Sequence, residues 1–116
     1  MRYILLSADS LPTLYEAPDK VAERLSDFCF RFLDEINGPE SPFVRMMQDA
    51  SGAEYAALSY TEMDFLNWLN SQPETAGQPV REAELISKEE RENIMETARR
   101  ERYLPWERQQ YPWFNF

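Results

Sequence analysis

Residues 21–36 read VAERLSDFCFRFLDEI, and this stretch decides the fold more than any other part of the 116-residue chain. Its apolar side chains recur three or four positions apart, which is the spacing of one face of an amphipathic helix. They are Val21, Leu25, Phe28, Cys29, Phe32, Leu33 and Ile36. Pro18 precedes the stripe and Asn37-Gly38-Pro39 follows it, so we expect one continuous helix that begins near Pro18 and ends at Ile36.

The opposite side of this predicted helix carries Glu23, Asp27, Phe30 and Asp34, at spacings of four, three and four. Three carboxylates would form a ridge there, with one aromatic ring between them. Aromatic anchors ringed by charged groups are common at protein interfaces. We therefore predict a partner-binding site in which Phe30 fills a pocket and the acids pair with Lys or Arg. The alternative is that another part of the chain, such as the aromatic tail, covers Phe30.

Outward from this helix, the sequence predicts an α+β fold: a helix-dominated single domain over residues 1–116, with a small sheet of two or three strands. Helices are predicted over residues 41–49, 61–70 and 87–104, and strands over residues 3–6 and 80–86. Thr61 with Asp64 has the spacing of a helix N-terminus, and Ser87 with Glu90 has the form of a capping box. Residues 55–60 fit either a strand or the start of the following helix.

Residues 104–116 form a tail that is rich in aromatic side chains and follows a helix break at Pro105. These aromatic residues are Trp106, Tyr111, Trp113, Phe114 and Phe116. Left in water they would make an aggregation-prone patch, so we expect the tail to dock, either on its own body or on another chain. The neighbouring basic residues Arg99, Arg100, Arg102 and Arg108 are expected to pair with acids of the body and help to seat the tail.

The chain is strongly acidic, with 12 basic and 21 acidic residues and a net charge of −9. Residues 1–86 hold 15 acids and 6 bases, whereas residues 87–116 hold 6 of each. A negative field repels nucleic acid and anionic membranes, and it speeds the encounter with basic partners. We therefore expect the partner to be a basic protein, such as a toxin or a nucleic-acid-binding enzyme, and expect no direct contact with nucleic acid or membrane.

Several residue types on which enzymes and metal sites depend are scarce or missing. The chain has no histidine, its single cysteine lies on the apolar stripe, and its three glycines are isolated from one another. A histidine triad, a usual zinc site, a redox pair and a phosphate-binding loop cannot be built from this set. Carboxylate pairs such as Glu62 with Asp64 would suffice for acid–base or magnesium chemistry, but 21 acids produce such pairs by chance. We predict no enzyme activity, no cofactor and no metal.

Together these features predict a small, cytoplasmic, acidic binding protein that neutralises a basic protein partner. Immunity proteins and inhibitors that block a nuclease toxin, as in toxin–antitoxin pairs, have this character, because carboxylates can occupy a site that binds phosphates. The single cysteine rules out a scaffold built on internal disulfides, and no apolar run is long enough to span a membrane. Two alternatives remain: a regulatory or adaptor subunit that docks through its aromatic tail, and a self-associating structural protein, such as a homodimer closed by the tail or by Phe30.

Overall fold

Two strands near the N-terminus form the centre of the main sheet. The structure is a computed structural model, and it describes residues 1–8, 11–38 and 40–116. These strands, β1 (Arg2–Ser7) and β2 (Thr13–Ala17), pair antiparallel with Ile4 opposite Tyr15. β5 (Arg81–Glu82) joins β2 antiparallel and β6 (Trp113–Asn115) joins β1 in parallel, which gives the order β5-β2-β1-β6.

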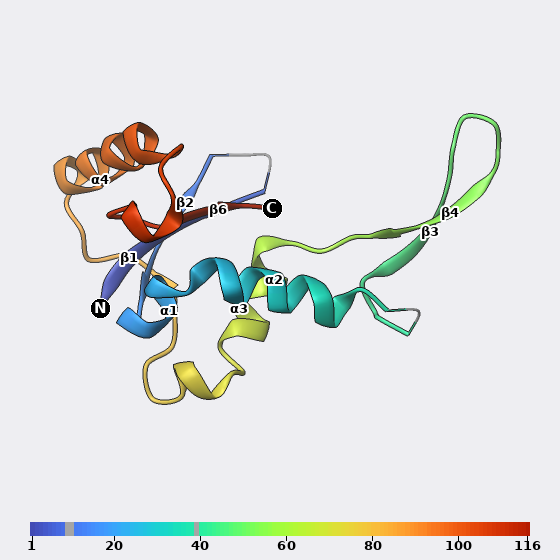
Figure 1. Cartoon of the computed structure of the whole chain (residues 1–116), viewed down its shortest axis with the longest axis horizontal. Helices are drawn as coiled ribbons and strands as arrows, with labels where there is room; N and C mark the ends of the chain where they lie inside the picture. The colour runs from blue at the N-terminus through green and yellow to red at the C-terminus, as the bar shows by residue number, and fades with distance from the viewer. Residues whose placement is uncertain (9–10, 39) are drawn as a thin grey trace.

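Helices pack on both faces of this sheet (Figure 1). Ile4, Leu6 and Tyr15 belong to the core formed with α1 (Asp19–Glu23), α2 (Leu25–Ile36) and α3 (Glu62–Leu69). Leu5 and Leu14 belong to a second core formed with α4 (Lys88–Glu101). Because consecutive side chains of a strand point to opposite faces, a strand covered on both sides has no polar alternation. This explains why Ile4, Leu5 and Leu6 are all fully buried.

Phe32 is the centre of the aromatic core on the α2 side of the sheet. Its ring lies 5.4 Å from that of Phe65 and 5.5 Å from those of Tyr60 and Trp68, between centroids. Cys29 is buried beside it in the same core, and burial raises the pKa of its thiol. The apolar stripe of the sequence therefore packs inward, as its spacing predicts.

The predicted continuous helix is wrong in one respect, because it is interrupted at Arg24. This residue has φ −124° and ψ 27°, outside the helical region, so α1 ends at Glu23 and α2 begins at Leu25. The apolar spacing continues across the break, and Val21 and Leu25 are both buried, so periodicity alone gives no sign of it. α2 ends at Ile36 as expected, whereas Pro39 of the predicted stop signal lies outside the described residues.

The predicted helix over residues 41–49 is also wrong, because this segment is a strand. β3 (Val44–Gln48) and β4 (Glu54–Leu58) pair antiparallel into a separate two-stranded sheet, which projects from the body (Figure 1). We call β3, its turn and β4 the β-arm. Asp49 Oδ1 accepts hydrogen bonds from the N–H groups of Ser51 and Ala53, and Gly52 has a φ of +84°. This turn chemistry closes a hairpin, where the sequence suggested the end of a helix.

The described residues form four helices and six strands in two sheets. The mixed α+β class is confirmed, whereas the helix-dominated description and the sheet of only two or three strands are wrong. Both predicted helix N-termini are confirmed: Thr61 Oγ1 accepts from the Asp64 N–H, and Ser87 Oγ accepts from the Glu90 N–H. Among the described residues, the reciprocal carboxylate bond of a capping box is formed by Asp64 to the N–H of Thr61 and not by Glu90. Short 3₁₀ turns cover Pro73–Thr75 (η1) and Trp106–Arg108 (η2). Among the described helices, none combines the length and the apolar composition that a membrane-spanning helix requires.

The aromatic tail is part of the main sheet of its own chain. The N–H of Phe116 donates to the Ser7 carbonyl at 2.8 Å, the N–H of Leu5 donates to the Pro112 carbonyl at 2.9 Å, and Trp113 Nε1 donates to Ser7 Oγ at 3.0 Å. The guanidinium of Arg102 lies 5.0 Å from the centre of the Trp113 ring. The sequence predicts ion pairs between acids of the body and Arg99, Arg100, Arg102 and Arg108. Within residues 1–8, 11–38 and 40–116, none of these four arginines forms an ion pair. Arg102 instead contacts the tail through its cation–π interaction.

Candidate functional site

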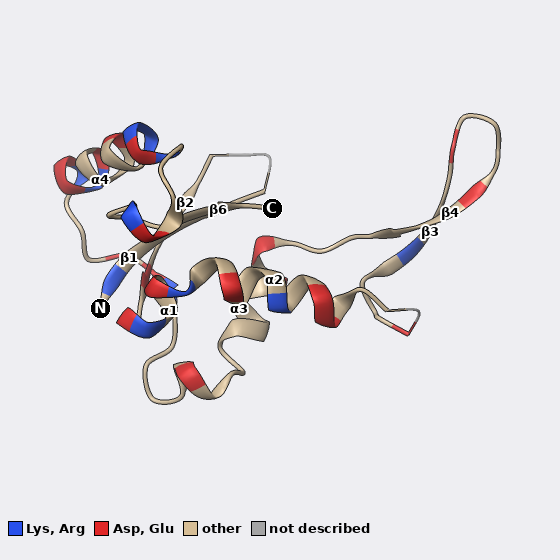
Figure 2. Ribbon diagram, in the orientation of Figure 1, with Lys and Arg blue, Asp and Glu red and all other residues tan. Residues whose placement is uncertain are grey.

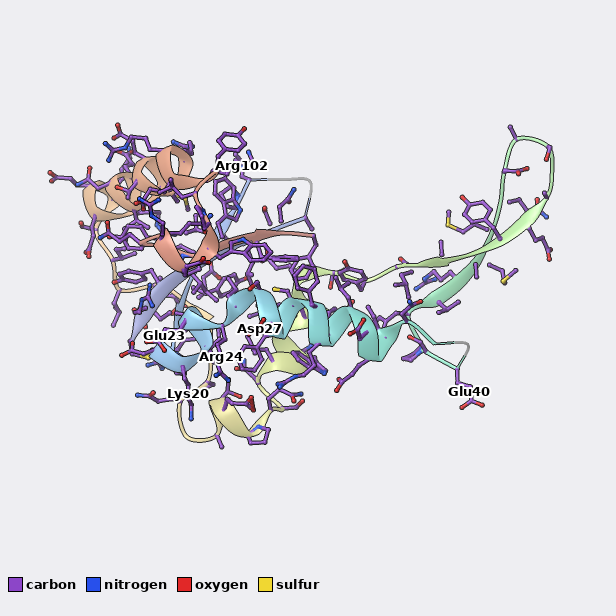
Figure 3. All side chains as sticks on the ribbon, viewed as in Figure 1. Lys20, Glu23, Arg24, Asp27, Glu40 and Arg102 are labelled. Carbon is purple, nitrogen blue, oxygen red and sulfur yellow. The ribbon has the colours of Figure 1, made fainter. Side chains whose placement is uncertain are left out.

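The predicted carboxylate ridge lies along α1 and α2 and crosses the break between them. Glu23 is the last residue of α1, whereas Asp27, Phe30 and Asp34 all belong to α2. Residues three and four apart on a helix are neighbours, so these three α2 residues share one face. All four side chains are exposed, and Figure 3 labels Glu23 and Asp27 in this region.

Phe30 is partly covered by the tail and partly open to solvent. Its ring centroid lies 5.9 Å from that of Trp106 and 5.8 Å from that of Phe114, the second contact being edge-on. The side chain nevertheless keeps 49% of its surface exposed, and Trp106 keeps 45%. The tail therefore covers one side of the Phe30 ring, as the alternative interpretation expects, and the other side is open to solvent.

The other tail aromatics divide between the two cores. Phe114 and Phe116 pack against the core on the α2 side, and Tyr111 and Trp113 pack against the core on the α4 side. A hollow of about 180 Å³ beside Trp106 is lined by Arg102, Trp113, Phe114 and Asn115. The ridge and the tail, which are far apart in sequence, thus meet in one place. We call it the α2–tail surface, made of Glu23, Asp27, Phe30, Asp34, Trp106 and Phe114.

The carboxylates of this surface are not engaged by cations of the described chain. Glu23, Asp27 and Asp34 form no ion pair with another described residue, because the ion pairs there use Asp19, Glu74, Glu16 and Glu92. Figure 2 shows acidic residues on all four helices and on the β-arm, so charge alone does not mark one face. What distinguishes the α2–tail surface is a half-exposed aromatic pair with unengaged carboxylates around it.

The carboxylates of Glu62 and Asp64 form hydrogen bonds within the fold. Among the residues that the structure describes, no cluster of three Asp, Glu or Cys side chains is placed to hold a metal ion. Glu62 accepts a hydrogen bond from the Tyr15 hydroxyl, and Asp64 accepts from the N–H of Thr61. This carboxylate pair is therefore committed to structural contacts.

No protein-family model, curated protein or solved structure matches the chain. The function has to be inferred from the residues and the geometry themselves.

Sequence reasoning missed the β-arm as a candidate interaction element. The usable signal was Asp49 through Gly52, a cluster of turn-forming residues between Val44–Gln48 and Glu54–Leu58. An open hollow of about 470 Å³ lies where the arm leaves the body, lined in part by Pro42, Phe43 and Trp68.

Proposed function

We propose that the chain is a stoichiometric binding protein that neutralises a basic protein partner, in the manner of immunity proteins and of inhibitors that occupy a phosphate-binding site. The observation that carries the proposal is Phe30, half exposed on α2 between Asp27 and Asp34 and in contact with Trp106. The aromatic pair would anchor in a partner pocket, and the carboxylates would accept charge-assisted hydrogen bonds from Arg or Lys.

The magnitudes indicate which contacts must dominate binding. Burying a Phe side chain contributes roughly 1.5–3 kcal/mol, so the exposed half of Phe30 contributes about 1 kcal/mol. A nanomolar complex needs about 12 kcal/mol. The aromatic pair therefore fixes the position of the partner, and most of the affinity has to come from paired charges and close packing around it.

The overall charge supports the same assignment. A net charge of −9 accelerates capture of a basic protein, and it disfavours nucleic acid as the direct ligand. A nuclease toxin fits this class of partner, because its active site presents cations to a phosphate backbone that carboxylates can imitate. We place this activity in the cytoplasm, in keeping with a chain that has one cysteine, buried in the core.

The position of the tail favours this assignment over an adaptor that docks through residues 104–116. Its backbone is paired with β1, and Phe116 packs against the rings of Tyr60 and Phe65. A recognition peptide would have to leave these contacts before it could bind, and that loss would weaken its binding.

Affinity capture from the native host tests the proposal when two variants with equal net charge are compared. Asp27→Lys with Asp34→Lys reverses the ridge, and Glu89→Lys with Glu96→Lys reverses two exposed acids of α4. We expect the wild type and the α4 variant to recover one basic protein at a ratio of one partner per chain, and the ridge variant to lose it. Equal recovery by both variants, or equal loss, contradicts the proposed site.

The kinetics of the recovered complex supply a second test. If charge steering drives capture, the association rate should fall steeply as salt is added, because the Debye length shrinks from about 10 Å at 0.1 M to about 3 Å at 1 M. Phe30→Ala should mainly raise the dissociation rate, because it removes an anchor and leaves the charge unchanged. An association rate that does not respond to salt argues against an acidic inhibitor.

A further inference from the structure

The β-arm exposes apolar side chains on both of its faces. Pairing in the hairpin places Met46 and Leu58 on one face, and Met47 and Tyr55 on the other. These four side chains are 36–64% exposed. A lone two-stranded hairpin is marginally stable in water, and an apolar one is an aggregation hazard. The arm therefore has exposed apolar side chains and unpaired strand edges that a partner would cover.

The accessible surface area and the radius of gyration of the chain both exceed those of a compact monomer of its size. The chain exposes 7718 Å², whereas a folded monomer of 13.8 kDa exposes about 6,600 Å². Its radius of gyration is 16.0 Å, against about 13 Å for a compact domain of this length. The excess of about 1,100 Å² is larger than the roughly 800 Å² that one subunit contributes to a standard interface, so the exposed surface is sufficient for one.

We propose that the arm pairs with the arm of a second copy of this chain. The charge of the arm supports this occupant over a basic protein, because Arg45, Asp49 and Glu54 are its only charged residues. The arm thus offers a basic partner little to recognise, unlike the α2–tail surface. Two antiparallel arms also leave the acidic bodies at opposite ends of the dimer, where their repulsion is weakest.

The hydrogen-bond pattern identifies which strand groups face outward. The N–H of Ser59 donates to the Phe43 carbonyl at 2.7 Å, and the N–H of Asp49 donates to the Ala53 carbonyl at 3.0 Å. Since bonded and non-bonded pairs alternate in an antiparallel ladder, Tyr55 and Ala57 bond to β3. The backbone groups of Ala56 therefore point to the outer edge of β4.

The β4 edge is better suited to self-pairing than the β3 edge. Charged side chains commonly protect edge strands, and β3 carries Arg45 in its interior, whereas the charge of β4 is at its end, on Glu54. When the β4 strands of two copies pair antiparallel about a two-fold axis at Ala56, this small residue lies opposite Ala56 of the second copy. Glu54 then lies opposite Leu58 of the second copy. The two Glu54 residues are then about 13 Å apart along the strands, beyond the Debye length of about 8 Å.

Sedimentation velocity and light scattering test the arm-paired dimer with two matched proline variants. Ala56→Pro removes an outward N–H from the β4 edge, and Gln48→Pro removes one from the β3 edge; neither touches the internal ladder. We expect a wild-type mass of twice 13.8 kDa. Ala56→Pro should raise the dissociation constant roughly thirtyfold, because each dimer loses two backbone hydrogen bonds. Gln48→Pro should leave the constant unchanged.

A second pair of variants covers the case in which proline disturbs the hairpin itself. Ala56→Glu places two carboxylates face to face at the two-fold axis, whereas Gln48→Glu adds the same charge on β3. Only Ala56→Glu should dissociate the dimer, and added salt should restore it. A wild-type chain that stays monomeric at every concentration overturns the proposal, as do equal effects of the two members of either pair. The ridge variant Asp27→Lys with Asp34→Lys should remain dimeric, which separates this result from the proposed function.

Discussion

Replacing Phe116 by alanine tests whether the tail is a folded part of the domain. The Phe116 ring lies 5.0 Å from that of Phe114, 5.1 Å from that of Phe65 and 5.6 Å from that of Tyr60, between centroids. A fully buried Phe→Ala change costs about 3–5 kcal/mol, and Phe116 is half-buried. We therefore expect Phe116→Ala to lower the free energy of unfolding by about 2 kcal/mol, which is about 8 °C in Tm for a domain of this size.

Urea denaturation followed by far-UV circular dichroism measures this loss, and Tyr103→Ala is its matched control. Tyr103 is an aromatic residue that directly precedes the tail, but 91% of its surface is exposed. The control should change the free energy of unfolding by no more than about 0.5 kcal/mol. If Phe116→Ala is as mild as Tyr103→Ala, the tail does not stabilise the body, and binding through a released tail becomes the better hypothesis.

Three further predictions concern the body of the domain. Thr61→Ala should cost about 1 kcal/mol in the free energy of unfolding, because it removes the α3 cap, while Thr61→Ser keeps most of it. Phe32→Ala should cost about 3–5 kcal/mol in the same urea assay, because Phe32 is fully buried among aromatic rings. Burial, and then the hydrogen bond to Glu62, raise the pKa of Tyr15 above its ordinary value of 10.0. The resulting stabilisation is complete below pH 10.0 and is lost as the pH rises toward the folded pKa, so Tyr15→Phe should flatten the alkaline decline of Tm.

Local signals in the sequence predicted the helices better than the strands. A helix stripe and a helix cap depend on residues three or four positions apart, and the caps at Thr61 and Ser87 lie where that spacing puts them. The pairing of β6 with β1 joins Phe114 to Leu6, which are distant in the sequence, so no local pattern reports it. The β-arm was missed because its turn residues are also the residues that end helices.

The candidate site was predicted in part, for the same reason. Helical periodicity placed Asp27, Phe30 and Asp34 on one face, and this is a local property of α2. That Trp106 contacts Phe30 depends on the path of the tail across the sheet, which the spacing of residues cannot reveal. The sequence therefore presented as two separate candidate sites what the fold brings together as one surface.

The two proposed surfaces depend on different forces, and salt should separate them. The α2–tail surface relies on carboxylates that screening weakens, whereas the β-arm relies on backbone pairing and apolar contact, which screening hardly affects. Raising the salt concentration should therefore slow capture of a basic partner while the dimer persists. Because arms paired antiparallel hold the two bodies at opposite ends, each body would bind its own partner without obstruction by the other. A complex of two chains and two partners is the stoichiometry that follows, and both proposals have to hold for it to form.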